Sequence, residues 1–259
     1  MSKTTLSHRQ RIEACISNQR PDRVPVALWR HFPMDDQTPG GLAEAVADFQ
    51  RQFDFDLIKV SPNSSYCIRD WGAQDQWQGS SEGTNQYLEP LIQSPQDWLK
   101  LSPQHPRQGS LNNMILSLQM LQTEFSPHTP IIQTIFSPLA QAKNLAGTRR
   151  LVEHLRCFPE EVQAGLETIT TTILRFIEEL VKMKLDGIFY AVQFGQYGLL
   201  SAAEFDQFGR SYDLRILDAA RPLWLNMAHL HGEAIMFDKV TDYPVDILNW
   251  HDRHTPPSL

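Results

Sequence analysis

The chain has 259 residues, of which 41% are hydrophobic and 20% charged, and this is the composition of a folded globular protein and not of a disordered one. Its net charge is −7 with acidic and basic residues interleaved, which argues against a surface for nucleic acid or anionic membranes. The three cysteines are widely spaced and form no CxxC pair, which argues against a disulfide framework. Residues 1–8 lack the apolar core of a signal peptide, and no apolar run approaches the ~20 residues of a membrane span. We therefore expect a cytoplasmic protein that acts on a small molecule.

The N-terminal half alternates predicted helices and strands. Ser7 is a candidate cap for a helix within residues 5–19, whose apolar side contains Ile12 and Ile16. The elements expected next are a strand that ends at Arg30 and His31, a loop over 36–41, a helix over 42–53, a strand over 56–60, an irregular or hairpin segment over 62–92, and a helix over 111–125 behind Ser110. This order predicts a β-α-β unit at the start of the chain.

The C-terminal half continues the alternation. The expected elements are a strand over 129–136, a helix entered at Ser137-Pro138, a long helix with an apolar face from Val162 to Leu180, a strand over 187–192, a helix with a capping box of Ser201 and Glu204, a strand over 222–233, and a strand over 243–253. Six βα repeats with right-handed crossovers predict an α/β fold of the (β/α)8 TIM-barrel type that stops two units short of closure. We expect one domain over residues 1–259, truncated at its C-terminal units.

The strand over 222–233 carries the strongest indication of a functional site. Because side chains alternate along a strand, His229 and His231 share one face and lie about 7 Å apart. In a βα-barrel the active site lies at the C-terminal ends of the strands, which is where the two histidines fall. Their rings can converge on one metal ion or on one anionic group of a substrate; equally, backbone groups and water can satisfy them.

Four further patterns can be compared with known families. They are Arg20-Pro-Asp-Arg-Val-Pro-Val, Phe136-Ser-Pro-Leu-Ala-Gln-Ala, Gly198-Leu-Leu-Ser-Ala-Ala-Glu-Phe and His229-Leu-His-Gly. Together with the order of the elements, they resemble the uroporphyrinogen decarboxylase superfamily, which also includes zinc-dependent methyltransferases that act on methylated corrinoids and thiols. The last pattern is similar to the His-x-Cys-Gly zinc motif of those methyltransferases, with His231 in the cysteine's place. The resemblance covers essentially the whole chain.

The departures from the family pattern concern the substrate. The decarboxylases hold the porphyrinogen carboxylates with two arginines at the end of strand one, and they bind the pyrrole nitrogens with an aspartate at the end of strand two. Only Arg30 stands in a matching place here, and Val60-Ser-Pro-Asn replaces the aspartate. An octa-acid substrate needs several fixed cations. The resemblance therefore favours a methyltransferase-like enzyme over uroporphyrinogen decarboxylation.

The leading hypothesis is a divergent metal-dependent, methyltransferase-like enzyme. His229 and His231 would hold Zn²⁺ or another divalent ion, and Glu233 or Asp252 would complete or orient the metal sphere and join the catalytic set. The candidate substrate-binding residues are Arg30, His31, Gln193, Tyr197, Asn249 and His251. His251 with Asp252 could instead substitute for a missing metal ligand or orient the first pair. No nucleotide cofactor is expected, and the resemblance implies a corrinoid protein as partner and a homodimer.

Two alternatives stay open. One is a carboxy-lyase that acts on uroporphyrinogen or another carboxylated aromatic in porphyrin biosynthesis, with Arg30 anchoring a carboxylate and a histidine donating a proton. The other is an inactive or incomplete barrel, whose last strand would leave an unpaired edge for another chain to cover.

Overall fold

The structure is a computed structural model that describes residues 5–259, so the first four residues of the segment examined for a signal peptide lie outside it. The centre of the fold is one sheet of β1 (Ile58–Val60), β4 (Ile131–Phe136), β5 (Gly187–Val192), β6 (Met227–Leu230) and β7 (Ile247–Trp250), in the order β1-β4-β5-β6-β7. Every neighbouring pair in this sheet is parallel. All residues of β4 and β5 are buried, as parallel strands covered on both faces require. The predicted α/β class is confirmed.

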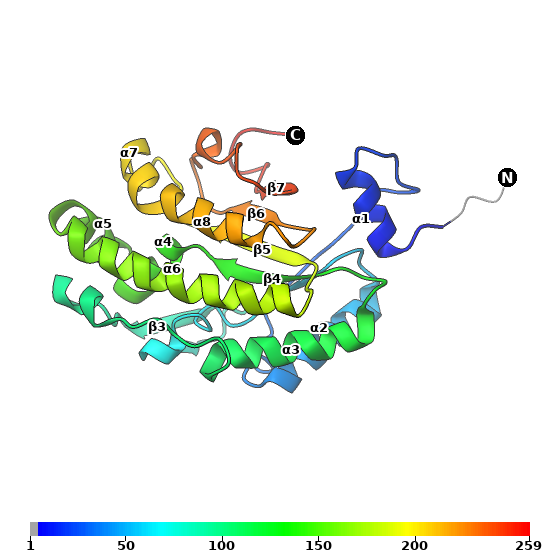
Figure 1. The fold of residues 1–259 in the computed structure, drawn as a ribbon, viewed down its shortest axis with the longest axis horizontal. Helices are drawn as coiled ribbons and strands as arrows, with labels where there is room; N and C mark the ends of the chain where they lie inside the picture. Colours follow the sequence, from blue (N-terminus) through cyan, green and yellow to red (C-terminus); the bar gives the residue numbers. More distant parts are fainter. Residues whose placement is uncertain (1–4) are drawn as a thin grey trace.

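Helices connect the strands and cover the outside of the sheet. They are α1 (His8–Ile16), α2 (Pro39–Phe53), α3 (Gly109–Phe125), α4 (Pro138–Ala146), α5 (Thr148–Cys157), α6 (Pro159–Lys182), α7 (Ala202–Phe205) and α8 (Ser211–Ala220), with a π-helical turn at Asp206–Arg210 and 3-10 turns at Arg69–Trp71, Pro95–Lys100 and Phe237–Lys239. Packing runs from α2 to α3, from α3 to α6 and from α6 to α8, and Figure 1 shows this row along one side of the sheet. The predicted hairpin segment contains the antiparallel pair β2 (Gln74–Trp77) and β3 (Asn85–Glu89).

Helix starts follow the local signals in the sequence. The Ser7 side chain accepts a backbone N–H bond at the start of α1. Ser137 does the same at α4, with Pro138 at the first helical position. Ser201 and Glu204 form the predicted reciprocal capping box at α7. These three starts are confirmed because each depends on contacts within four residues of chain.

The predicted strand that ends at Arg30 and His31 is wrong. Residues 24–31 belong to no strand in the structure. The N–H of Val26 donates to a carboxylate oxygen of Asp56 at 2.7 Å and its carbonyl accepts the Asp56 N–H at 2.9 Å, so its polar groups have partners outside a ladder. Val26 is also 51% exposed, which shows that the apolar alternation here does not mark a covered face.

Two smaller predictions are also wrong. The expected loop over 36–41 ends early, because Thr38 caps α2 and the helix begins at Pro39. Ser110 is not a cap but lies inside α3, and its hydroxyl donates to the Asp70 carboxylate at 3.1 Å. At α2 the contact comes from the Thr38 side chain, whereas at α3 the Asp70 carboxylate, from another part of the chain, accepts the Ser110 N–H at 2.8 Å.

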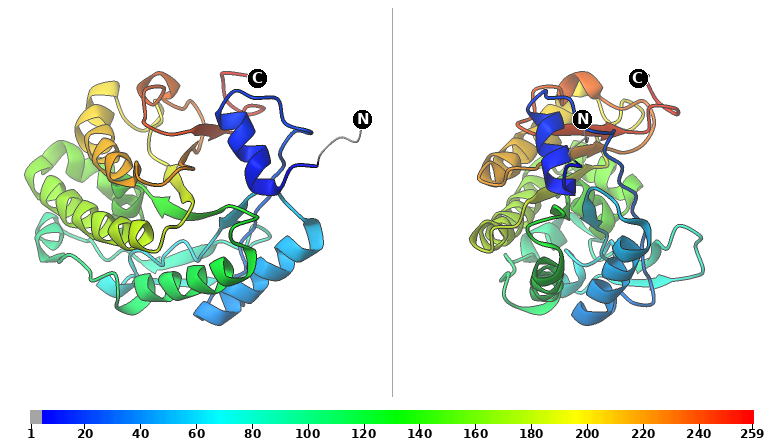
Figure 2. Two further views of the ribbon diagram at one scale, coloured as in Figure 1. Left: turned by 45° about the vertical axis from the view of Figure 1, so that its right-hand side comes forward. Right: turned by 90° about the vertical axis from the view of Figure 1, so that its right-hand side faces the viewer.

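Helix α1 covers the N-terminal end of the sheet. His8 hydrogen-bonds Thr129 just before β4, Arg9 pairs with Asp186 just before β5, and the Arg9 guanidinium lies over the Trp224 ring before β6. Figure 2 shows α1 apart from the row of outer helices. The opposite, C-terminal end of the strands is therefore the end at which a site can open. No helix within residues 5–259 has both the length and the apolar character needed to cross a membrane.

Candidate active site

A cavity of about 630 Å³ opens where the strands end. Most of its lining alternates with period two along the strands and the residue that follows each, as expected for side chains on the inner face of a sheet. The pairs are Lys59 and Ser61 at β1, Thr134 and Phe136 in β4, Phe189 and Ala191 in β5, His229 and His231 at β6, and Asn249 and His251 at β7, where Ser61, His231 and His251 come directly after their strands; Trp250 of β7 also lines the cavity. The fold thus brings the predicted histidine pair to a cavity at the predicted end of the sheet.

Three histidines form a tight triangle in this cavity. The ring centroids of His229 and His231 lie 5.8 Å apart, those of His229 and His251 5.5 Å, and those of His231 and His251 5.7 Å. Three imidazoles bound to one zinc ion through nitrogens at about 2.0–2.1 Å would have centroids roughly 5.2–5.5 Å apart. Among residues 5–259, no three His, Cys, Asp or Glu side chains already stand as a metal centre. The spacing fits such a centre after the rings turn.

Asn249 fixes the orientation of the innermost histidine. Asn249 is the register partner of His229 across β6 and β7, and its Oδ1 lies 2.7 Å from His229 Nδ1. Because an amide oxygen can only accept, Nδ1 carries the proton and Nε2 keeps a free lone pair. Phe189 stacks on the same ring, with centroids 5.1 Å apart. His229 therefore offers one nitrogen to the cavity, as metal-bound histidines do when a second group holds the other nitrogen.

Burial favours the neutral form of two of these imidazoles, those of His229 and His231. It lowers the pKa of His229 to about 4, against the opposing effect of the Asn249 bond and with help from His231 and His251. It also lowers the pKa of His231, to which a charge on His251 contributes. Only a neutral imidazole can bind a metal ion, so the environment favours the ligand form at neutral pH.

The predicted substrate-binding residues Arg30, His31 and Gln193 also line the cavity. Arg30 is exposed, and its guanidinium lies over the ring of Phe32 at 5.4 Å. Burial lowers the pKa of His31, and the charge of Lys59 lowers it further. Although residues 24–31 form no strand, they therefore bring the two side chains to the place expected from a strand end.

Three other predicted residues do not line the cavity. The chain turns at Gly232, where φ is +110°, and the exposed Glu233 then bonds the Gln196 side chain through its own N–H. Tyr197 is 50% exposed and donates its hydroxyl to Asp238. The Asp252 carboxylate lies 3.3 Å from the Arg253 guanidinium. Neither Glu233 nor Asp252, the carboxylates expected beside the histidines, lines the cavity.

Comparisons with known proteins identify the family to which this chain belongs. The family model described as uroporphyrinogen decarboxylase (URO-D) matches residues 7–257. The chain belongs to the URO-D family. Among solved structures, 23 chains match, and one of them is a methyltransferase from Methanosarcina mazei with a TM-score of 0.75 and 14% identity over 94% of this chain and 75% of that chain. At this identity the likeness shows the fold. The comparison with curated proteins gave no match.

Within this URO-D chain, the most informative cavity residue that the sequence reasoning missed is Lys59. Lys59 was taken only as part of a strand, although it is a charged residue inside the apolar run Leu57-Ile58-Lys59-Val60. The charged residue within this apolar run is the signal that could have identified Lys59. A strand that is buried on both faces carries a charged side chain only where that charge has a structural or functional role. His251 was expected to bind substrate or, with Asp252, to substitute for a missing metal ligand, and its ring is equidistant from the other two histidines to within 0.2 Å.

Proposed function

We propose that this member of the URO-D family is a metal-dependent, methyltransferase-like enzyme. The observation that carries the proposal is the triangle of His229, His231 and His251, whose ring centroids lie 5.5–5.8 Å apart and come within the spacing of three ligands of one divalent ion once the rings turn. Three imidazole ligands with an open fourth position are a ligand set typical of catalytic Zn²⁺. A bound ion of this kind would lower the pKa of a thiol or a water molecule and supply the anion at neutral pH.

The residues of the chain have separate tasks in this proposal. Asn249 holds the proton on His229 Nδ1 and so aims Nε2 at the ion. Arg30 and Gln193, on other segments of the cavity wall, would orient the substrate, and Phe189 supports the His229 ring and excludes water from one side of it. Methyl transfer to a thiol requires this positioning and this exclusion of water, because its rate depends on a desolvated, correctly placed nucleophile.

The proposal extends to the type of fold. The curved parallel sheet with outer helices would be part of a (β/α)8-type barrel, with the cavity at the strand ends where barrels place their sites. A corrinoid protein would then carry the methyl donor to the cavity.

The test is demethylation of methylcobalamin in the presence of a small thiol. The zinc-loaded protein should convert methylcobalamin to cob(I)alamin as the methyl group moves to the thiol sulfur, and the absorbance change should depend on zinc. His231→Ala should lower the rate at least about 100-fold, and His128→Ala, which removes an exposed ring far from the cavity, should not. Equal rates in the chelator-treated protein and the loaded protein would contradict the proposal.

A carboxy-lyase is the second candidate, because Arg30 lies in the cavity wall, where it could anchor a carboxylate. A spectroscopic assay with uroporphyrinogen separates the two. Formation of coproporphyrinogen that Arg30→Met abolishes would favour decarboxylation, and its absence would leave methyl transfer as the better account.

A further inference from the structure

The ammonium group of Lys59 is buried among aromatic rings. Lys59 is 9% exposed, and its Nζ lies 4.5 Å from the Phe189 ring centroid and 5.4 Å from that of Trp29. Among the residues that the structure describes, its one hydrogen-bond partner is Ser61 Oγ, at 2.9 Å. Within residues 5–259, no carboxylate forms an ion pair with it, in contrast to the buried Arg11, which pairs with Asp22 and Asp56. A buried ammonium without an anion is costly, so this position needs an explanation.

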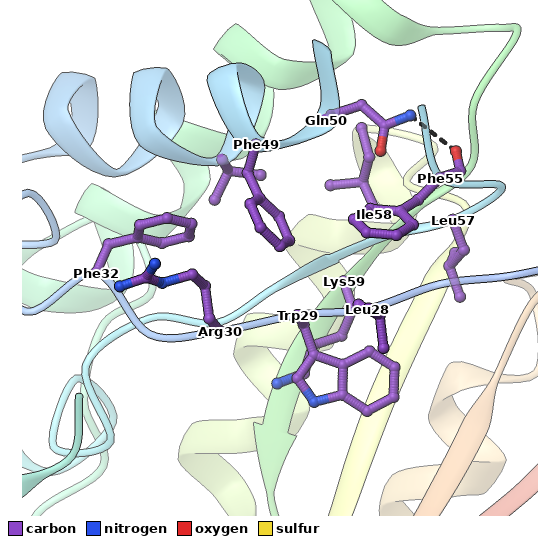
Figure 3. A pocket seen from close by; sticks show the side chains of 11 residues that line it. Leu28, Trp29, Arg30, Phe32, Phe49, Gln50, Phe55, Leu57, Ile58 and Lys59 are labelled. Atoms are coloured by element: carbon purple, nitrogen blue, oxygen red, sulfur yellow. Dashed lines mark hydrogen bonds between the residues drawn. The ribbon is translucent and has the colours of Figure 1, made fainter. Parts of the chain in front are cut away.

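The amine faces the large cavity. Figure 3 shows the Lys59 side chain beside Trp29 at a second hollow, which has only about 10 Å³ and could hold no more than one water molecule. Ser61, which accepts a hydrogen bond from Nζ, and Phe189, whose ring centroid lies 4.5 Å from it, line the large cavity and not this hollow. The small hollow therefore borders the aliphatic part of Lys59, while the amino group of Lys59 faces the large cavity, where a substrate fits.

The cavity wall is positive when Lys59 is protonated, although the chain is acidic. Arg30 and the protonated Lys59 are its cations, and Glu82 is its one carboxylate among the residues that the structure describes. The chain as a whole carries a net charge of −7, so this local excess is not a property of the composition. A concave wall of one sign raises the local concentration of the opposite ion.

We propose that Lys59 and Ser61 form an anion subsite that holds the carboxylate of a monoanionic substrate across the cavity from the three histidines. A single ammonium with one neighbouring hydroxyl matches one negative charge, whereas a phosphate dianion would require more donors. The Trp29 and Phe189 rings would cover the apolar part of the same ligand. Phe189 also stacks on His229, so one side chain joins the subsite to the proposed metal site.

The subsite has a consequence for pH. Burial lowers the pKa of Lys59 to about 7, so a bound carboxylate should raise this pKa and draw a proton onto the amine. The other charged or titratable groups of the cavity wall are Arg30, His31, Glu82, His229, His231 and His251. Burial lowers the pKa values of His31, His229 and His231, so their protonation changes below neutral pH and not above it. Carboxylate affinity should therefore fall between pH 7 and pH 9 through Lys59.

The experiment is calorimetric titration of the metal-free protein with benzoate, acetate, benzamide and inorganic phosphate. Benzoate should bind most tightly, benzamide should bind weakly at every pH, and benzoate affinity should decrease as the pH rises from 7 to 9. Lys59→Met, which keeps the length of the side chain, should weaken benzoate about 10- to 100-fold and remove the pH dependence. Ser61→Ala should weaken it less. Lys100→Met, at an exposed lysine outside the cavity, is the matched control.

This proposal shares its cavity with the proposed function but not its metal, so the two can fail separately. If Lys59→Met does not fold, the pH profile of the wild type still decides. Benzoate binding that is unchanged in Lys59→Met, a flat wild-type pH profile, no saturable benzoate binding to the wild type, or tighter binding of phosphate than of benzoate would each overturn the carboxylate subsite. If the wild type binds benzoate but shows no metal-dependent activity, only the metal proposal is overturned.

Discussion

His229 Nδ1 lies 2.7 Å from Asn249 Oδ1, and this bond joins two adjacent strands at the position where their residues are register partners. The contact selects the His229 tautomer whose Nε2 is free to accept a metal ion. In the proposed metal site, Asn249 therefore supports a ligand and does not contact the substrate.

Replacement of Asn249 should therefore weaken metal binding without unfolding the protein. Asn249→Leu removes the acceptor and should lower zinc affinity about 10- to 100-fold in a competition titration with a chromophoric chelator. Asn249→Asp keeps an acceptor and should restore affinity to at least the wild-type value. Equal affinities for the wild type and Asn249→Leu would show that the contact does not support the ligand.

The stability of the metal-free protein should depend on the protonation of His229. Burial lowers its pKa from 6.5 to about 4, so between these values the unfolded chain binds more protons than the folded one. The free energy of unfolding should therefore rise with pH between about 4 and 6.5 and level off above. Compared with His229→Gln, the wild type should gain about 2 kcal/mol over this window, after allowance for solvent screening, in urea denaturation. Parallel pH profiles for the two proteins would contradict this.

Asp56 should be important for stability and not for catalysis. It is 1% exposed and accepts from Arg11, from Arg23 and from the Val26 N–H. Asp56→Ala leaves the buried Arg11 guanidinium with one carboxylate partner fewer and should cost about 3–5 kcal/mol in chemical denaturation. Glu167→Ala, which breaks the exposed pair with Arg215, is the control and should cost less than about 1 kcal/mol. Similar costs for the two variants would mean that the buried network is not a stabilising one.

Much of the fold could be predicted from sequence because its signals are local. The strand Gly187–Val192 was predicted to the residue, since it is a short apolar run between a helix end and a polar loop. The segment over 24–31 was mistaken for a strand because Val24, Val26 and Leu28 alternate, yet all three are exposed. Alternation shows that a strand is compatible with the sequence, but a pairing partner decides whether it forms.

The candidate site could be predicted only in part for the same reason. His229 and His231 were found because they stand two residues apart on one strand. His251 joins them through the parallel register of β6 and β7, in which Asn249 lies opposite His229, and no local pattern gives that register. Glu233 follows in sequence but turns away at Gly232, so nearness along the chain misled the assignment.

The most direct test of the central claim is the metal content of purified, untagged protein, measured by mass spectrometry after growth with added zinc. The wild type and His128→Ala should each hold about one divalent ion per chain, and His229→Ala, His231→Ala and His251→Ala should each lose it. No metal in the wild type, or one ion per chain that survives His231→Ala, would contradict a metal site formed by the three histidines.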